Sequence, residues 1–259
     1  MNFSSIIGFL GAAAVLAFAV LEAKGASAVL LNIHALMIVV GGTAAAACVC
    51  FPIGRIIRLT LVALKKLVGA AGQDYQAIIR EVISLAEGMQ RDPNYPRTAV
   101  NSVKNEFLRE GLQLLVNGAT EDQLWDIMSA RMDTFKRRQA EEVNMFKTLA
   151  RFPPAFGLLG TTFGMIALLN ELGGADAQKK VGPAMAIGLV ATLYGIAIAN
   201  FVFVPIGENL SAANSEGYNA RKMILEGLMM IKRKTHPILV EEKMKSFLLP
   251  AERARLAGR

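Results

Sequence analysis

The chain has 259 residues, of which 53% are hydrophobic, and its mean hydropathy is +0.40. These values exclude a water-soluble enzyme and are typical of a polytopic membrane protein with a sizeable soluble part. The net charge of +7 requires no nucleic-acid partner. An excess of cytoplasmic basic residues, attracted to anionic lipid headgroups, explains it.

Four apolar runs lie along the chain, and each is close to the roughly 20 residues that a helix needs to cross a bilayer. They are Phe3–Leu21, Ala28–Phe51, Phe152–Leu169 and Val181–Val204. The first run lacks the basic start of a cleaved signal peptide, because no Lys or Arg precedes Lys24. We therefore predict an all-α, polytopic membrane protein with four transmembrane helices and a helical cytoplasmic domain.

The basic residues predict the topology. Of 28 Lys and Arg residues, 15 lie between Phe51 and Phe152 and 10 lie after Gly207. Cytoplasmic loops carry the excess of basic residues, so both termini are predicted to be cytoplasmic. The predicted domains are transmembrane helices 1 and 2 (residues 1–52), a cytoplasmic helical domain (53–150), a pore-lining hairpin of transmembrane helices 3 and 4 (151–206) and cytoplasmic C-terminal helices (207–259).

The second apolar run contains the segments GGTAAAA and CVC. Glycine weakens a helix by about 1 kcal/mol relative to alanine, so Gly41-Gly42 predicts a tight helix crossing or a local break. Cys48 and Cys50 are expected to be small buried hydrophobes rather than a metal or redox pair, since no other cysteine exists and no histidine is near.

The segments outside the apolar runs read as helices and turns. The segment from Arg55 predicts an amphipathic helix that emerges from the bilayer or lies at its surface. A charged helix from Glu121 to Lys147 is expected to lead straight into the third membrane helix. The expected turns and caps are a turn at Asp92-Pro93 and Tyr95-Pro96, a turn at Asn117-Gly118, an N-cap at Thr120 and a helix break at His236-Pro237.

No Asp, Glu, Lys or Arg lies inside any of the four runs. A protein that moves ions normally needs an ionisable group at membrane depth, so a partner helix would have to supply the carboxylate. Thr161, Thr162 and Thr192 offer hydroxyl oxygens, which can replace part of the hydration shell of a small cation. The alternative is that these hydroxyls bond only to carbonyls of their own helix.

Two prolines stand at the inner ends of the third and fourth membrane helices. Pro154 and Pro205 can each bend a helix and leave a carbonyl free. They are either ordinary helix-end residues or hinges that couple membrane events to the cytoplasmic domain.

The cytoplasmic domain carries charges at Arg91, Glu106, Arg109 and Glu110. These charges are either a solvated surface or a docking surface. The sequence has no phosphate-binding loop and no cluster of His, Cys and carboxylate residues with metal-ligand spacing, so no cofactor is expected.

Several segments of the sequence closely resemble those of the MotA/PomA family, which forms the larger subunit of the ion-driven flagellar stator. They are PPAFGLLGTTFGMIALL, VGPAMAIGLVATLYGIAIANFVFVPIGENL, VVGGTAAA and NEFLREGLQLLVNG. The resemblance covers nearly the whole chain, including the order of four membrane helices and the long middle loop.

The resemblance implies a non-enzymatic motor component of the flagellar basal body in the bacterial inner membrane. In that family five such chains surround two copies of a MotB/PomB-type partner, whose single helix carries the ion-binding Asp. Passage of Na⁺ or H⁺ rotates the ring, and its cytoplasmic charges push on the rotor protein FliG. The partner would then carry the carboxylate that the apolar runs of this chain lack.

The resemblance also assigns roles to residues. Pro154 and Pro205 match the family's two functional prolines. Thr161 and Thr192 are similar to threonines of the sodium-driven PomA branch, although Ala191 departs from its Thr-Thr pair, and Na⁺ is favoured over H⁺.

The rotor-facing region matches less well, because only Arg91 preserves the family's basic pair and His236-Pro237-Ile238 lacks the family's Arg. Glu106, Arg109 or Glu110 are candidates to compensate. The alternative function is a proton-driven energiser of an envelope machine, of the ExbB/TolQ kind or a non-flagellar relative, although those chains usually have three membrane helices.

Overall fold

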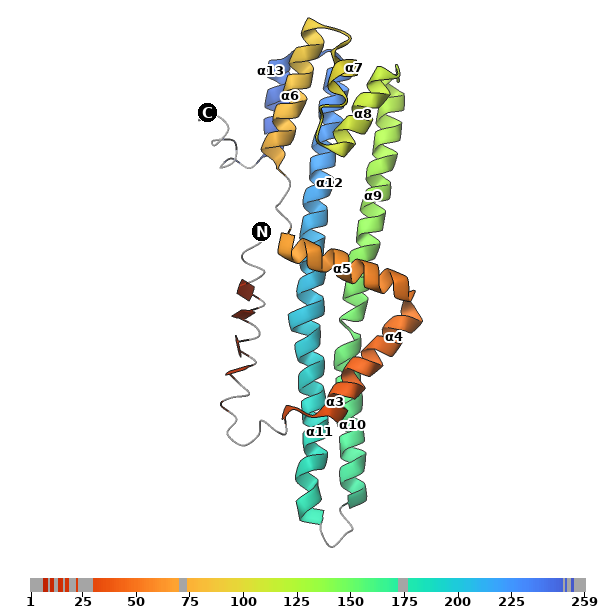
Figure 1. Ribbon diagram of the computed structural model, residues 1–259, viewed down its shortest axis with the longest axis vertical. Coiled ribbons are helices and arrows are strands. Elements are labelled where there is room, and N and C mark those ends of the chain that lie inside the picture. The colour runs from red at the N-terminus through yellow and green to blue at the C-terminus, as the bar shows by residue number, and fades with distance from the viewer. Residues whose placement is uncertain are drawn as a thin grey trace. The chain divides into compact units, whose positions relative to one another are not determined.

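The computed structural model describes residues 30–69, 74–171 and 177–248, together with isolated positions between 7 and 22 and residues 250 and 253. The predicted first membrane helix and the link after it lie almost entirely outside the described residues. All regular secondary structure in the described part is helical (Figure 1).

The helices follow the order of the predicted segments. They are α3 (Ile33–Leu36), η1 (Met37–Gly41), α4 (Gly42–Cys50), α5 (Ile53–Gly69), α6 (Tyr75–Arg91), α7 (Tyr95–Ala99), α8 (Glu106–Val116), α9 (Glu121–Leu149), α10 (Phe152–Glu171), α11 (Ala177–Ile198), η2 (Ala199–Phe203), α12 (Val204–Lys232) and α13 (Pro237–Lys245), where η marks a π-helical segment. By length and composition, three stretches of the described helices could cross a membrane: Ile33–Cys50, and the apolar parts of the helical stretches Glu121–Asn170 and Val181–Lys232.

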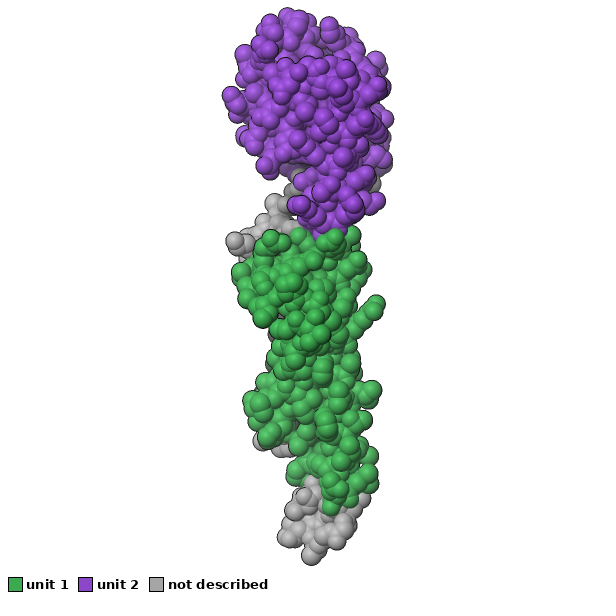
Figure 2. All heavy atoms as spheres, turned by 90° about the vertical axis from the view of Figure 1, so that its right-hand side faces the viewer, with its two compact units in different colours: residues 1–70, 140–211 green, residues 71–139, 212–259 purple. Residues whose placement is uncertain are grey.

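The chain folds into two compact units, which Figure 2 shows in green and purple. Unit 1 contains residues 1–70 and 140–211, and unit 2 contains residues 71–139 and 212–259. Each unit therefore takes its helices from two separate stretches of the sequence, and α9 and α12 contribute residues to both.

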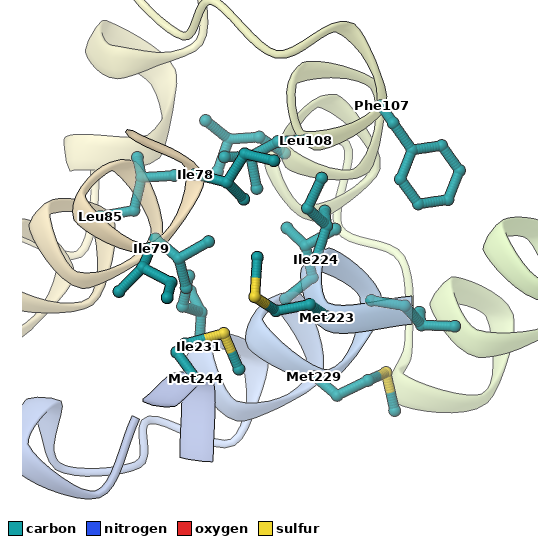
Figure 3. Close-up of a cluster of buried hydrophobic side chains, with 14 of the residues drawn as sticks. Ile78, Ile79, Leu85, Phe107, Leu108, Met223, Ile224, Met229, Ile231 and Met244 are labelled. Carbon is teal, nitrogen blue, oxygen red and sulfur yellow. The ribbon is translucent and has the colours of Figure 1, made fainter. Parts of the chain in front are cut away.

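Unit 2 is a helical domain with one apolar core. Apolar residues of α6 recur three or four positions apart, as in Ile78, Val82 and Leu85, so they share one helix face. That face packs against apolar residues of α8, α9, α12 and α13, and Figure 3 shows Leu108, Met223 and Met244 among these side chains.

The turns and caps of unit 2 follow from local chemistry. Gly118 has a φ of +84°, a conformation that favours glycine. The hydroxyl of Thr120 accepts a hydrogen bond from the amide of Gln123 at 3.3 Å, and the Gln123 side chain accepts one from the Thr120 amide at 3.0 Å, which together form a capping box. The turn predicted at Asp92-Pro93 and Tyr95-Pro96 is present between α6 and α7, where the Tyr95 amide donates a hydrogen bond to the Asp92 carbonyl at 3.0 Å. Tyr95 and Pro96 themselves begin α7, because proline fits the first turn of a helix.

Unit 1 holds the apolar helices. One cluster joins α4, α5, α9 and α12 through residues such as Ala47, Leu59, Phe146 and Leu210. The prediction of a tight crossing at Gly41-Gly42 was correct, because a Cβ at Gly42 would lie 2.3 Å from the Phe156 ring on α10.

One prediction for unit 1 was wrong and another is confirmed. Cys48 and Cys50 are exposed rather than buried in this chain, because α4 turns them away from the protein helices that it packs against. The charged helix α9 leads into α10 as predicted, in one helical stretch from Glu121 to Asn170 that is interrupted only by a turn at Ala150 and Arg151.

Candidate functional site

Helices α10 and α11 run antiparallel, side by side, as a hairpin (Figure 1). Small residues let their backbones approach closely. A Cβ at Gly164 would lie 2.9 Å from the carbonyl oxygen of Ala184, and one at Gly188 would lie 3.0 Å from the Cα of Thr161. The small residues are evident in the sequence, but only the structure shows which residue of the facing helix each one contacts.

The N-terminal turn of α10 contains two prolines. Pro153 and Pro154 lie in its first turn, and because proline has no N–H group, the ladder of α9 cannot continue through them. Helix α11 passes this point closely, since a Cβ at Gly195 would lie 2.4 Å from the carbonyl oxygen of Pro153 and 3.1 Å from the Cα of Pro154. Pro154 therefore lies where the two helices are in backbone contact.

Pro205 lies one residue inside α12, directly after the π-helical segment η2. In a regular α-helix its ring would clash with the carbonyl four residues earlier. The wider π turn relieves this clash and lets the helical path continue. Such π-helical segments occur often at functional sites.

The hydroxyl groups of Thr161 and Thr192 meet across the hairpin at 2.5 Å. Thr161 Oγ1 lies 3.2 Å from the carbonyl oxygen of Gly157 and 3.0 Å from that of Gly188, and Thr192 Oγ1 lies 3.3 Å from that of Gly157. Four oxygens from both helices therefore gather at one half-buried place. Three of these four contacts join the two helices, so bonding within a single helix does not describe the pair.

Thr162 is placed differently from its neighbour. It is exposed, and its hydroxyl donates to the carbonyl of Leu159 in its own helix at 2.7 Å. Ala191, at the position where the sodium-driven branch has threonine, is fully buried against Gly160. The structure thus brings Thr161 and Thr192 together and leaves Thr162 outside the cluster.

Two features of the hairpin were missed by sequence reasoning. The Tyr194 hydroxyl donates to the carbonyl of Leu30, which ties α11 to the chain three residues before the start of α3. Pro183 lies inside α11, where its missing N–H leaves a backbone carbonyl without its helical partner. No sequence pattern predicts the hydrogen bond of Tyr194. Pro183, in contrast, could have been identified from its place within an apolar run.

Much of the outer surface of the hairpin is apolar. The exposed side chains include Leu158, Phe163 and Ile166 of α10 and Leu189 and Leu193 of α11. Exposed apolar side chains in this number on two packed helices indicate a surface that faces lipid or another protein helix.

The charged residues singled out in the middle domain lie on α6 and α8. Arg91 and Glu106 are exposed, and Arg109 and Glu110 are half-buried. Glu110 accepts a hydrogen bond from Arg131 at 2.8 Å, and Arg109 forms no ion pair with any described residue. Glu106, Arg109 and Glu110 therefore lie within one turn of α8, whereas Arg91 is the last residue of α6.

Arg221 of α12 lies in unit 2, beyond the apolar runs, and sequence reasoning missed it. Its guanidinium stacks on Phe135, 3.6 Å from the ring centroid, and lies 5.5 Å from that of Phe107. Partial burial lowers the pKa of Arg221, and the nearby carboxylates of Glu110 and Glu106 act in the opposite direction. Within the described part of the chain, no three His, Cys, Asp or Glu side chains gather to hold a metal ion.

Comparison with known proteins agrees with this arrangement. Residues 99–223 match the model of the MotA/TolQ/ExbB proton channel family. The chain is 26% identical over 254 residues to the chemotaxis protein PomA of Vibrio alginolyticus, covering 98% of each chain. It is 30% identical over 181 residues to motility protein A of Borreliella burgdorferi, covering 70% of this chain and 68% of that one.

Two solved structures share the fold. The flagellar MotAB stator complex of Bacillus subtilis matches with a TM-score of 0.85 at 25% identity, over 98% of this chain and 99% of that one. The MotAB structure of C. jejuni matches with a TM-score of 0.86 at 22% identity, over 96% and 97%.

A helical hairpin whose two apolar runs carry no charged residue, matched by an ion-channel family, defines this protein as a membrane channel component rather than an enzyme. The chain belongs to the MotA/PomA family of flagellar stator proteins. The sequence-based resemblance and the all-α membrane fold are thereby confirmed. Its apolar helices and its family locate it to the inner membrane, in the flagellar motor.

Proposed function

We propose that this chain forms a cation channel with a MotB/PomB-type subunit and couples ion flow to torque on the rotor protein FliG. The observation that carries the proposal is the Thr161–Thr192 hydroxyl pair, on a hairpin whose apolar run has no Asp, Glu, Lys or Arg. A single helix of the partner supplies the ion-binding Asp, and this chain supplies the polar wall beside it. The MotAB complex from Bacillus subtilis, which shares the fold, supports such a partner.

Na⁺ is the proposed ion, in preference to H⁺. Hard cations bind oxygen ligands, and the pair brings two hydroxyls together with the carbonyls of Gly157 and Gly188. Each hydroxyl can donate to a carbonyl when the ion is absent and turn a lone pair toward the ion when it arrives. Thr162 belongs to the proposed pathway only as an exposed hydroxyl one residue from the pair.

Pro154 and Pro205 are the proposed hinges. Each stands at the inner end of a membrane helix, where the regular α-helical ladder is interrupted. Movement of the hairpin can bend the chain at these two points without breaking hydrogen bonds, because proline has none to break.

The proposed assembly is a pentamer of this chain in the inner membrane, with both termini cytoplasmic. Lipid contacts the remaining apolar surface of the predicted domains 1–52 and 151–206. The residue ranges 53–150 and 207–259 then form the cytoplasmic part.

The proposed rotor contact uses Arg91, Glu106, Arg109 and Glu110. Arg91 and Arg109 are the sharpest tests, because both lack an ion pair among the described residues. Charge reversal of either should lower torque while the stator still assembles. Unaltered torque in both variants would remove them from the interface.

The function as a whole is tested in the host. The gene is deleted and restored, and swimming speed is recorded at fixed pH while Na⁺ is exchanged for K⁺. Speed that depends on the gene and follows Na⁺ supports both the motor and the ion. Gene-dependent speed that ignores Na⁺ makes the motor proton-driven, and no effect on motility favours the ExbB/TolQ-like alternative, which the shared family model keeps open.

A further inference from the structure

We propose that a small cavity in unit 2, at the C-terminal ends of α6 and α12, is a docking pocket for one apolar side chain of an acidic protein segment. The inference rests on the proposed function for the identity of the partner, which would be the rotor. The cavity has a volume of about 230 Å³. Ala86 and Ile231, both buried, form its floor, and the exposed residues Gln90 and Lys234 form its rim.

The size of the cavity selects the kind of ligand. Pockets for small molecules and cofactors usually measure roughly 300–1,000 Å³, so this one is too small for a nucleotide. It is large enough for the side chain of a leucine, methionine or phenylalanine. Buried apolar anchors of this kind commonly dominate the affinity of a protein interface.

The rim determines the charge of the partner. Lys234 is the only charged residue that lines the cavity, and it forms no ion pair with any described residue. Arg91 and Asp92, which lie between the lining residues Gln90 and Pro93, are both exposed and carry opposite charges, so Lys234 sets the charge of the rim. Charge complementarity therefore favours a carboxylate beside the anchoring side chain.

The backbone at Lys234 is unusual. Its φ is +55°, a conformation that glycine adopts at less cost than lysine. Hydrogen bonds from the Lys234 amide to the Ile231 carbonyl and from the Thr235 amide to the Met230 carbonyl, both 3.0 Å, hold it there. A charged side chain thus occupies a helix end where glycine would be more stable, and strained residues of this kind gather at binding sites.

The chain beyond the cavity adds apolar surface. Ile238 and Leu239, in the first turn of α13, are 64% and 59% exposed. Large exposed apolar side chains beside a cavity with a polar rim are typical of a protein-binding surface. The cavity thus adds an apolar anchor to a proposed contact that otherwise consists of charges.

The first test blocks the cavity without disturbing the core. Gln90→Trp fills the mouth from an exposed position, and Ser84→Trp places the same side chain at an exposed position on the other side of α6 as the matched control. Torque per stator unit is measured from the speed steps of a bead on a flagellum, and assembly from a fluorescent tag on the full complex. We expect at least a fivefold loss of torque for Gln90→Trp, at least a twofold loss for Lys234→Glu, and wild-type torque for Ser84→Trp, all with normal assembly.

Wild-type torque in Gln90→Trp would overturn the inference and leave the proposed function intact. A change in the number of copies per complex would also overturn it, because the pocket would then lie between copies of this chain.

A second measurement does not depend on motility. A photo-crosslinking amino acid replaces Gln90 in living cells, and the captured peptide is sequenced. An adduct on a rotor segment in which an apolar residue is flanked by Asp or Glu supports the pocket. An adduct on another copy of this chain, or the absence of any adduct, overturns it. Should the wild-type gene fail to restore motility, the proposed function fails, and this experiment still decides the pocket.

Discussion

Thr161 Oγ1 and Thr192 Oγ1 lie 2.5 Å apart across the α10–α11 interface, beside the carbonyl oxygens of two glycines. The pair needs those glycines, because a Cβ at Gly157 or Gly188 would push the helices apart. Close backbone packing and the oxygen cluster are therefore one feature of the hairpin.

Loss of either hydroxyl should reduce sodium-dependent motility. We expect Thr161→Ala and Thr192→Ala to lower swimming speed at limiting Na⁺, because each removes one of the four oxygens, while assembly changes little. Thr192→Ser keeps the oxygen and should retain most of the speed, so it serves as the control. Wild-type speed in both alanine variants would exclude the pair from the ion pathway.

The packing at Gly195 can be tested by adding one methyl group. Gly195→Ala places a Cβ 2.4 Å from the carbonyl oxygen of Pro153, and overpacking of this kind costs about 1–3 kcal/mol. We expect a lower unfolding temperature of the purified protein in detergent. Gly54→Ala in helix α5 is the control, since its Cβ would also meet nothing within 4 Å, and equal stability of the two variants would contradict the close approach.

Helix α5 is expected to lie in the interface between lipid and water. Leu59 and Ala63 pack against the protein, whereas Ile53, Ile57 and Leu61 form a second apolar stripe that is 60%, 56% and 57% exposed. These three residues are four apart, so they share one helix face, and the helix begins three residues after the apolar helix α4 ends. An apolar face of this kind enters the acyl boundary of a membrane.

Spin labels would measure the depth of this stripe in the reconstituted complex. The exposed Cys48 and Cys50 are first replaced by serine, and labels are attached at Ile57→Cys and, as a water-facing control, Arg58→Cys. Oxygen should relax the label at position 57, and a water-soluble nickel chelate the label at position 58. Protection of position 57 from both reagents would mean that another protein chain covers the stripe.

Arg221 should stabilise unit 2 through its flat guanidinium rather than through charge alone. Arg221→Lys keeps the charge but cannot stack on Phe135 in the same way, so we expect a loss of about 0.5–2 kcal/mol, the range of a partly buried cation–π contact. Hydrogen exchange of α12 amides in the full chain would report it. The exposed Lys222→Arg is the matched control, and equal exchange in both variants would refute the stacking argument.

The sequence by itself determined the helices and the class of protein. Apolar runs of membrane length, basic residues gathered outside them, the N-cap at Thr120 and the break at His236-Pro237 all act through neighbours in the chain. Local patterns of this kind can be read without knowing the fold, because hydropathy and cap chemistry depend on residues within a few turns.

Only the tertiary structure decided which residues meet. Thr161 and Thr162 are adjacent and chemically identical, yet one joins Thr192 and the other faces outward, because successive residues of a helix point about 100° apart. The stacking of Arg221 on Phe135 could not be predicted from the sequence either, because the two residues lie 86 positions apart in the chain. Contacts between distant segments depend on how helices are rotated and aligned against each other, and packing of their side chains sets that alignment.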